Sequence, residues 1–485
     1  MIVALRPYPE YRQSHLRWLE CVPTHWGEQR TKYLFREVDE RSATGTEEML
    51  SVSHITGVTP RRQKNVTMFM AESYAGHKLC RQGDLVINTM WAWMGALGVA
   101  KETGLVSPSY HVYRPADHMA LLPDYIDYLL RTRAYVSEYV CRSTGIRPSR
   151  LRLYPEQFLD IPLVYPPMDE QRTILAYLDA MDRAIRRYIR NKQRLIALLT
   201  EQKQAIIDRA VTRGVDANSR LAPSGVEWLG DVPEHWSVRS LKQVALVRLS
   251  GVDKVSAEGE CPVRLCNYTD VYNRDFITQD VAFMLGTATR AEVAGLGLRK
   301  GDVLITKDSE MWDDIAVPAL VVDDLDDVLC GYHLALIRPD PKQVMGEFLF
   351  RAFKAPTLAR QFNVAATGVT RYGISKHVIK TAVFPVPDLE EQRRICQWIT
   401  DPLSPLALAV RRARSEISLA QEYRTRLIAD VVTGKLDVRR APLEELTVMV
   451  DGLAPPGDFP DILESDESRD AYGFPGAEDD DKAED

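Results

Sequence analysis

Two stretches of the chain have the apolar spacing of long helices that pack along a seam. Apolar or long side chains recur there at alternating intervals of four and three residues, the pattern of a coiled coil. The seam positions are Ile174, Leu178, Met181, Ile185, Tyr188, Lys192, Leu195, Leu199, Gln202 and Ile206 in the first stretch, and Leu406, Val410, Ala413, Ile417, Ala420, Arg424, Leu427 and Val431 in the second. This spacing predicts helical segments over 167–216 and 387–437.

The two predicted helices differ in their seams and in their regularity. Small alanines in the second seam complement the larger leucines and isoleucines of the first, which favours packing of the two helices on each other, antiparallel. The polar seam residues Lys192, Gln202 and Arg424 either fix the register or lie at the edge of the stripe. Pro402 and Pro405 are expected to break the second helix, which restarts with Ser404 as N-cap. Asp388 and Glu391 have capping-box spacing.

The segments before each helix alternate short apolar runs with turns, which predicts two mixed α/β heads of one fold. Each head has a Gly-Asp turn leading into a buried strand, a strand that ends at proline, and an amphipathic helix. The strands lie at 83–88 and 110–115, and again at 301–306 and 332–339; the helices lie at 122–139 and 347–362. A Thr-Gly loop, a helix and a strand that leads to proline close each head.

The chain contains the same frame twice. The sequence Trp-Leu-x-x-Val-Pro-x-His-Trp at Trp18–Trp26 returns at Trp228–Trp236, an offset of 210. A proline followed by Glu-Gln-Arg opens each helical segment at an offset of 221, and Val-Thr-x-x-x-Asp closes it. We therefore predict two tandem α/β (α+β) heads joined by two long helices that form an antiparallel coiled coil. The predicted segments are an N-terminal extension (1–14), a first head (15–166), a first helical spacer (167–216), a second head (217–386), a second helical spacer (387–437) and an acidic tail (438–485).

Charge is distributed unevenly along the chain. Residues 441–485 hold 15 Asp and Glu against 2 Lys and Arg, so the net charge of −7 hides a mildly basic body. A basic body favours a polyanionic partner such as nucleic acid. The composition of the tail predicts disorder. The tail is either a solvated extension or a competitor of nucleic acid for the basic surface.

Composition and motifs argue against several classes of protein. The sequence has no run of about 18 apolar residues, no export signal and no CxxC pair, so we expect a reduced, cytoplasmic location without a membrane span, a zinc site or a disulfide framework. P-loop, dinucleotide-binding and HExxH motifs are missing. His25 and His235 recur beside Trp without a partner nucleophile, so we interpret them as packing or hydrogen-bonding groups.

Basic and aromatic residues of the divergent loops are the candidate DNA contacts. Loop 141–152 contains four arginines, and loop 367–377 contains further cations. Arg and Lys bind phosphates, and Arg reads guanine through two hydrogen bonds. The Trp residues after each Gly-Asp strand are core residues or base-stacking residues. The candidates are Arg61, Arg62, Lys64, Asn88, Trp91, Arg147, Arg150, Lys307, Ser309, Arg371, Tyr372 and Lys376. No residue is assigned to catalysis or to a metal.

The order of these motifs, present twice over 15–437, resembles that of the specificity subunits of type I restriction–modification systems. The resemblance implies that each head is a target recognition domain, which reads one half of a bipartite, asymmetric site in double-stranded DNA. It also implies that the helices set the gap between the half-sites. In this family the subunit performs no chemistry and binds no cofactor. It docks two methyltransferase subunits, which use S-adenosylmethionine, and through them restriction subunits that use ATP and Mg²⁺.

Two other functions are compatible with the residues. One is an orphan DNA-binding scaffold protein without restriction partners, which the absence of neighbouring methyltransferase and translocase genes would indicate. The other is a self-contained nuclease, which would cleave DNA alone in the presence of Mg²⁺.

Overall fold

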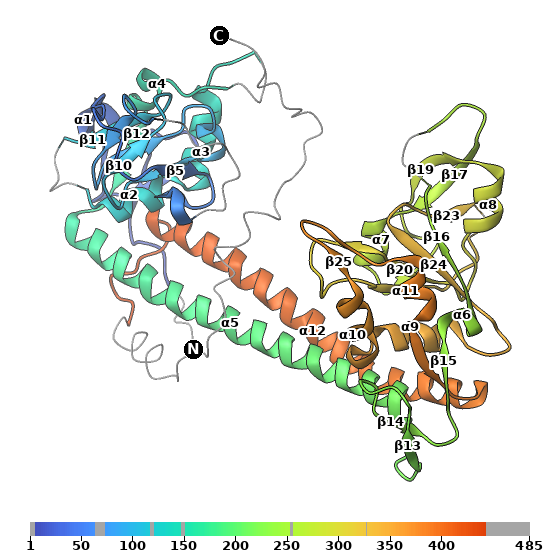
Figure 1. Cartoon of the computed structure of the whole chain (residues 1–485). Helices are drawn as coiled ribbons and strands as arrows, with labels where there is room; N and C mark the ends of the chain where they lie inside the picture. The colour runs from blue at the N-terminus through green and yellow to red at the C-terminus, as the bar shows by residue number, and fades with distance from the viewer. Residues whose placement is uncertain are drawn as a thin grey trace. The chain divides into compact units, whose positions relative to one another are not determined.

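The chain divides into two compact units, each of which combines an α/β head with parts of two long helices. The computed structural model describes residues 5–63, 73–116, 121–146, 151–252, 256–325 and 327–442. Unit 1 consists of Met1–Arg194 and Ser415–Asp485, and unit 2 of Leu195–Arg414. The long helices α5 (Met168–Arg213) and α12 (Leu389–Val432) contribute to both units (Figure 1). Each unit is described below by itself.

Unit 1 folds around an antiparallel sheet. Its elements before α5 are β1 (Tyr11–Gln13), β2 (Cys21–Pro23), β3 (Gly27–Arg30), α1 (Thr31–Leu34), β4 (Phe35–Val38), β5 (Leu50–Ser53), β6 (Gly57–Pro60), η1 (Arg61–Gln63), β7 (Lys78–Cys80), β8 (Leu85–Ile87), η2 (Ala92–Met94), β9 (Leu97–Val99), β10 (Gly104–Val106), β11 (His111–Pro115), α2 (Pro123–Leu130), α3 (Arg133–Arg142), α4 (Pro155–Leu159) and β12 (Pro162–Tyr165). The sheet order is β4-β11-β8-β9. Leu85 and Ile87 belong to one apolar cluster and Val86 to another, as the alternation of a strand requires.

Unit 2 repeats this plan around a larger sheet. Its elements before α12 are β13 (Leu221–Pro223), β14 (Asp231–Pro233), β15 (Ser237–Ser240), α6 (Leu241–Val244), β16 (Ala245–Leu249), β17 (Cys261–Cys266), α7 (Tyr268–Tyr272), β18 (Phe276–Ile277), β19 (Met284–Ala288), α8 (Arg290–Leu296), β20 (Val303–Thr306), β21 (Asp308–Ser309), β22 (Pro318–Val321), β23 (Val328–Cys330), β24 (Leu334–Pro339), α9 (Gly346–Lys354), α10 (Pro356–Ala365), β25 (Thr367–Gly368), β26 (Tyr372–Gly373), α11 (Lys376–Thr381) and β27 (Val383–Val386). The order β16-β24-β20-β22-β18 matches that of unit 1 with one strand added.

The predicted strands are confirmed, whereas the predicted amphipathic helix of each head is two helices. The Gly-Asp strands are β8 and β20, and the strands that end at proline are β11 and β24. In unit 2 the helix breaks at Ala355, which is extended because Pro356 follows it. In unit 1 it breaks at Thr132, which is also extended and whose hydroxyl donates to the carbonyl of Leu129 at 2.7 Å.

Helix is confirmed for both spacer segments, but the predicted break in the second is wrong. Pro402 and Pro405 lie inside α12, which is helical on both sides of them. Ser404, expected to be an N-cap, donates its hydroxyl to the carbonyl of Thr400 at 3.0 Å, as serines do inside a helix. The neighbouring Leu403 is buried, and this packing holds the segment helical despite the lost backbone donors. In the described part of the chain, no helix is long and apolar enough to cross a membrane.

Two polar seam residues pair between the helices of unit 1. Arg424 donates to the carboxylate of Asp182, and the ammonium of Lys192 lies 2.5 Å from Glu416. Because a rising number on α5 meets a falling number on α12, these helix portions are antiparallel. Seam residues near the helix ends are buried, whereas Tyr188 is 42% exposed. In unit 1 the pairing is therefore apolar near the helix ends and charged farther along.

Candidate nucleic-acid interface

In unit 1 the opening motif meets the first turn of α5 at the buried carboxylate of Glu170. The indole Nε1 of Trp26 donates to it at 3.0 Å and the hydroxyl of Tyr8 at 2.6 Å, and Nε2 of His25 lies 2.7 Å away. Burial and the bond to Glu170 raise the pKa of Tyr8. His25 is a hydrogen-bonding group, as predicted.

Unit 2 repeats this anchor. The indole of Trp236 donates to Glu391 at 3.0 Å, and Nε2 of His235 lies 2.8 Å from the same carboxylate. The backbone N–H of Glu391 donates to the side chain of Asp388 at 2.8 Å, so Asp388 caps the helix as expected. The residues shared by both copies therefore build the frame, which leaves recognition to the loops between them.

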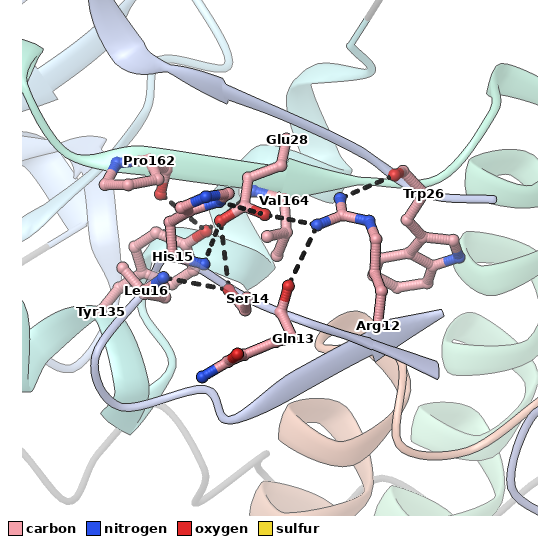
Figure 2. Close-up of polar contacts among 10 residues, drawn as sticks. All are labelled: Arg12, Gln13, Ser14, His15, Leu16, Trp26, Glu28, Tyr135, Pro162 and Val164. Atoms are coloured by element: carbon pink, nitrogen blue, oxygen red, sulfur yellow. Dashed lines mark hydrogen bonds and ion pairs between the residues drawn. The ribbon is translucent and has the colours of Figure 1, made fainter. Parts of the chain in front are cut away.

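A second carboxylate fixes the N-terminal segment of unit 1 (Figure 2). Glu28 on β3 accepts from Nη1 of Arg12 at 2.7 Å, from the hydroxyl of Ser14 at 3.2 Å and from the backbone N–H of His15 at 2.8 Å. Burial acts to raise the pKa of Glu28, but the bonds from Arg12 and His15 outweigh it and hold the pKa below its usual value. The segment that leads to Trp18 is therefore rigidly attached to the head.

In unit 2 three loops meet where β20 ends. Strand β21 pairs with β26, which places Ser309 opposite Tyr372. The backbone N–H of Ile374 donates to the carbonyl of Lys307 at 2.9 Å. The structure thus brings together four residues that the sequence predicts as DNA contacts, since Arg371 lies exposed at the tip of the β25–β26 turn.

A charged group supports this surface from below. The ammonium of Lys307 lies 2.9 Å from Asp308 and 5.2 Å from the centre of the Tyr332 ring. His333 bonds to the same carboxylate through Nδ1 at 2.5 Å and has a positive φ of 68°, which is rare outside glycine. Burial raises the pKa of Asp308, but its bonds with His333 and Lys307 lower the pKa further, so the carboxylate stays ionised.

Sequence reasoning missed Tyr268 and Tyr272 of α7. Their rings stack at 5.4 Å between centroids. Burial raises the pKa of Tyr268, which a bond with Ser309 and the charge of Arg371 oppose, so these residues lie together. The i, i+4 spacing of the two tyrosines was the available signal.

The Thr-Gly loop requires its glycine. Gly368 has a φ of 152°, and a Cβ there would lie 2.0 Å from the carbonyl oxygen of Arg371. Any other residue would therefore push the loop tip, and Arg371 with it, out of place. Nearby Lys376 is exposed in the first turn of α11.

In unit 1 the equivalent loops also meet. Thr144 and Arg152 exchange two backbone hydrogen bonds at the base of the arginine-rich loop, and the N–H of Leu153 donates to the carbonyl of Thr89 at 3.2 Å. Asn88 is buried, and its amide donates to the hydroxyl of Tyr110 at 3.0 Å, so it supports the loop from inside. Trp91 is exposed and is not a core residue.

The remaining candidates are only partly placed. Arg62 pairs with Glu48 at 3.0 Å and lies 3.6 Å from Glu102, and Arg61 is half-buried beside it. Lys64, Arg147 and Arg150 lie outside the described residues. Within the described ranges, no group of three or more His, Cys, Asp or Glu side chains is placed to hold a metal ion.

Comparison with known proteins agrees with the sequence resemblance. A family model described as the type I restriction modification DNA specificity domain matches residues 233–404. The type I restriction enzyme MjaVIII specificity subunit of Methanocaldococcus jannaschii is 22% identical over 316 residues, 65% of this chain and 70% of that protein. The putative type I restriction enzyme MjaX specificity subunit of the same organism is 23% identical over 177 residues, 36% of this chain and 40% of that protein.

Solved structures show a similar fold. One, described as the structural basis of complex assembly and conformational transition of the type I R-M system, has a TM-score of 0.59 at 15% identity and covers 86% of this chain and 99% of its own. The HsdS subunit of Thermoanaerobacter tengcongensis aligns over 86% of this chain and 98% of its own, at 16% identity and a TM-score of 0.44. Residues 233–404 are therefore a type I restriction–modification DNA specificity domain, and the chain is related to the specificity subunits of these systems.

Proposed function

We propose that the chain is a non-catalytic specificity subunit, which reads a bipartite and asymmetric DNA target in the cytoplasm through two tandem target recognition domains. The observation that carries this proposal is the repeated meeting of a strand-end loop with a Thr-Gly loop in both units, on frames whose anchors are the same. Equivalent loops of different sequence suit two half-sites of different sequence. The catalysis belongs to partner subunits, which would supply S-adenosylmethionine, ATP and Mg²⁺ chemistry.

Long-read methylation mapping of cells that carry the complete system tests this function. We expect a single methylated motif made of two unlike half-sites and a spacer of constant length. A methylated but undivided motif would contradict the proposal. DNA binding without any associated methylation would instead favour the orphan scaffold.

Recognition by the second head is expected to depend on Arg371. Replacing Arg371 with Ala should weaken binding by about 1–3 kcal/mol and relax selectivity in one half-site only, because the side chain lies at the tip of one loop. The measurement is a binding competition with duplexes mutated in either half-site. Arg360→Ala, an exposed substitution on α10 of the same unit, is the matched control. Equal losses at both half-sites would indicate global damage.

We also propose that the frame docks two methyltransferase subunits, one at each copy of the opening motif. Trp18 and Trp228 occupy matching positions, and both remain exposed although their motif neighbours Trp26 and Trp236 are buried. A repeated exposed Trp suits two copies of one partner. Trp18→Ala and Trp228→Ala should each remove one methyltransferase from the complex, and the double variant both, as measured by native mass spectrometry. Retention of both subunits by the double variant would sink this assignment.

A further inference from the structure

The loop after the Gly-Asp strand of unit 1 presents an exposed Met-Trp pair. Asn88 is buried, and its Oδ1 accepts from the backbone N–H of Met90 at 3.3 Å, which fixes the turn. Met90 and Trp91 are 40% and 47% exposed. Trp93 braces the pair: its ring stacks on Trp91 at 6.1 Å between centroids, and its indole donates to the carbonyl of Met90 at 2.9 Å.

Unit 2 contains the same element. Ser309 is buried to the same degree as Asn88, and its hydroxyl accepts from the backbone N–H of Met311 at 3.3 Å. Met311 and Trp312 are 56% and 51% exposed. All three positions lie 221 residues after their counterparts, the same offset as the helical segments. This repeat lies in the divergent part of the heads, where the surrounding loops share little sequence.

Exposure and surroundings indicate what this element binds. A solvent-facing Met-Trp pair is unfavourable unless a partner covers it. In unit 2 the pair directly follows β21, whose partner strand β26 follows the exposed Arg371; in unit 1 the preceding Thr89 bonds to the base of the arginine-rich loop. An apolar tip flanked by cations fits a nucleic acid, because the cations bind phosphates while the tip contacts bases.

We propose that Met90–Trp91 and Met311–Trp312 are apolar wedges, one in each head, which insert into a base step of each half-site and unstack it. This inference rests on the proposed function and adds to it a deformation that is the same at both half-sites. Because the pair is the same in both heads, it does not distinguish their sequences directly. It favours half-sites that contain a flexible step at the point of insertion, where unstacking costs least.

Fluorescence of 2-aminopurine tests the wedges. The full chain, without partner subunits, is mixed with a duplex that carries the mapped target, and adenines are replaced one at a time by 2-aminopurine. We expect a rise in fluorescence at one step of each half-site. Trp91→Ala should abolish the rise in one half-site and Trp312→Ala in the other, each with about tenfold weaker binding. Trp91→Phe should keep part of the signal. Trp398→Ala, an exposed Trp on α12, is the matched control and should change neither.

The outcomes separate this inference from the proposed function. Specific binding of the duplex without any local rise in fluorescence, or with a rise that survives both Trp→Ala substitutions, would overturn the wedges and leave the function intact. Normal DNA binding by the variants together with loss of a methyltransferase subunit would make the element a protein interface and would also overturn the wedges. Equal binding of target and scrambled duplexes by the unaltered chain would overturn the proposed function itself.

Discussion

Removing one heptad from each long helix is expected to shorten the spacer of the DNA target by about three base pairs and to leave both half-sites unchanged. The segments are 192–198 and 408–414, which face each other when the register of the Asp182–Arg424 pair is continued. Seven helical residues rise about 10 Å, and one base pair of B-DNA rises about 3.4 Å. Sites with the original spacer should lose modification completely.

Methylation mapping measures this change, because it returns both half-sites and the spacer together. The matched control replaces the same two heptads with sequence of equal length and the same seam pattern, which should keep the original spacer. Deleting 192–198 alone tests the pairing itself, since only one side of the seam is then shortened. An unchanged spacer in a stable double-deletion protein would end the proposal that the helices act as a ruler.

Replacing Asp302 with Ala is expected to destabilise unit 2 by about 3–5 kcal/mol, because it leaves the partner of a buried ion pair uncompensated. Asp302 is 2% exposed and accepts from Nε and Nη2 of Arg338 at 2.8 and 2.7 Å. It also accepts from the backbone N–H of Arg299 at 2.8 Å, which closes the turn before β20. Loss of Asp302 therefore disturbs the strand that positions the recognition loop.

Urea unfolding followed by intrinsic fluorescence measures this loss. Asp327→Ala is the matched control, since Asp327 also pairs with an arginine, Arg264, but on the surface, and its loss should leave the unfolding midpoint unchanged. Asp84→Ala should act on unit 1 as Asp302→Ala acts on unit 2, because Arg114 binds Asp84 through the same two nitrogens. A midpoint in Asp302→Ala equal to that of the control would refute the buried-pair argument.

The sequence predicted the elements whose signals are local. Alternating apolar residues located β8 and β20, and the seam spacing located α5 and α12. The break at Pro402 was wrong because propensity describes an isolated helix, whereas here a buried Leu403 beside the prolines favours continuation. The two-helix form of each amphipathic segment was missed because Pro356 marks only one of the two breaks.

The candidate site was harder to predict, since it depends on contacts between distant residues. Lys307, Ser309 and Tyr372 were found individually, but their assembly with Tyr268 depends on pairing between β21 and β26. Asn88 was read as a contact from its place after a strand, and only its burial shows that it supports Met90 from inside. A sequence shows which groups are available, and the fold decides which of them face outward.

The end of α12 completes the head that was synthesised first. The hydroxyl of Tyr125 donates to the carbonyl of Val432, and that of Tyr11 to the carbonyl of Lys435 at 3.1 Å. Gly434, with a φ of 80°, packs against Pro23 and Trp26. On the ribosome, the N-terminal head must therefore wait for almost the whole chain before its last contacts can form, while unit 2 closes earlier from one continuous stretch of sequence. The order of folding thus runs opposite to the order of synthesis.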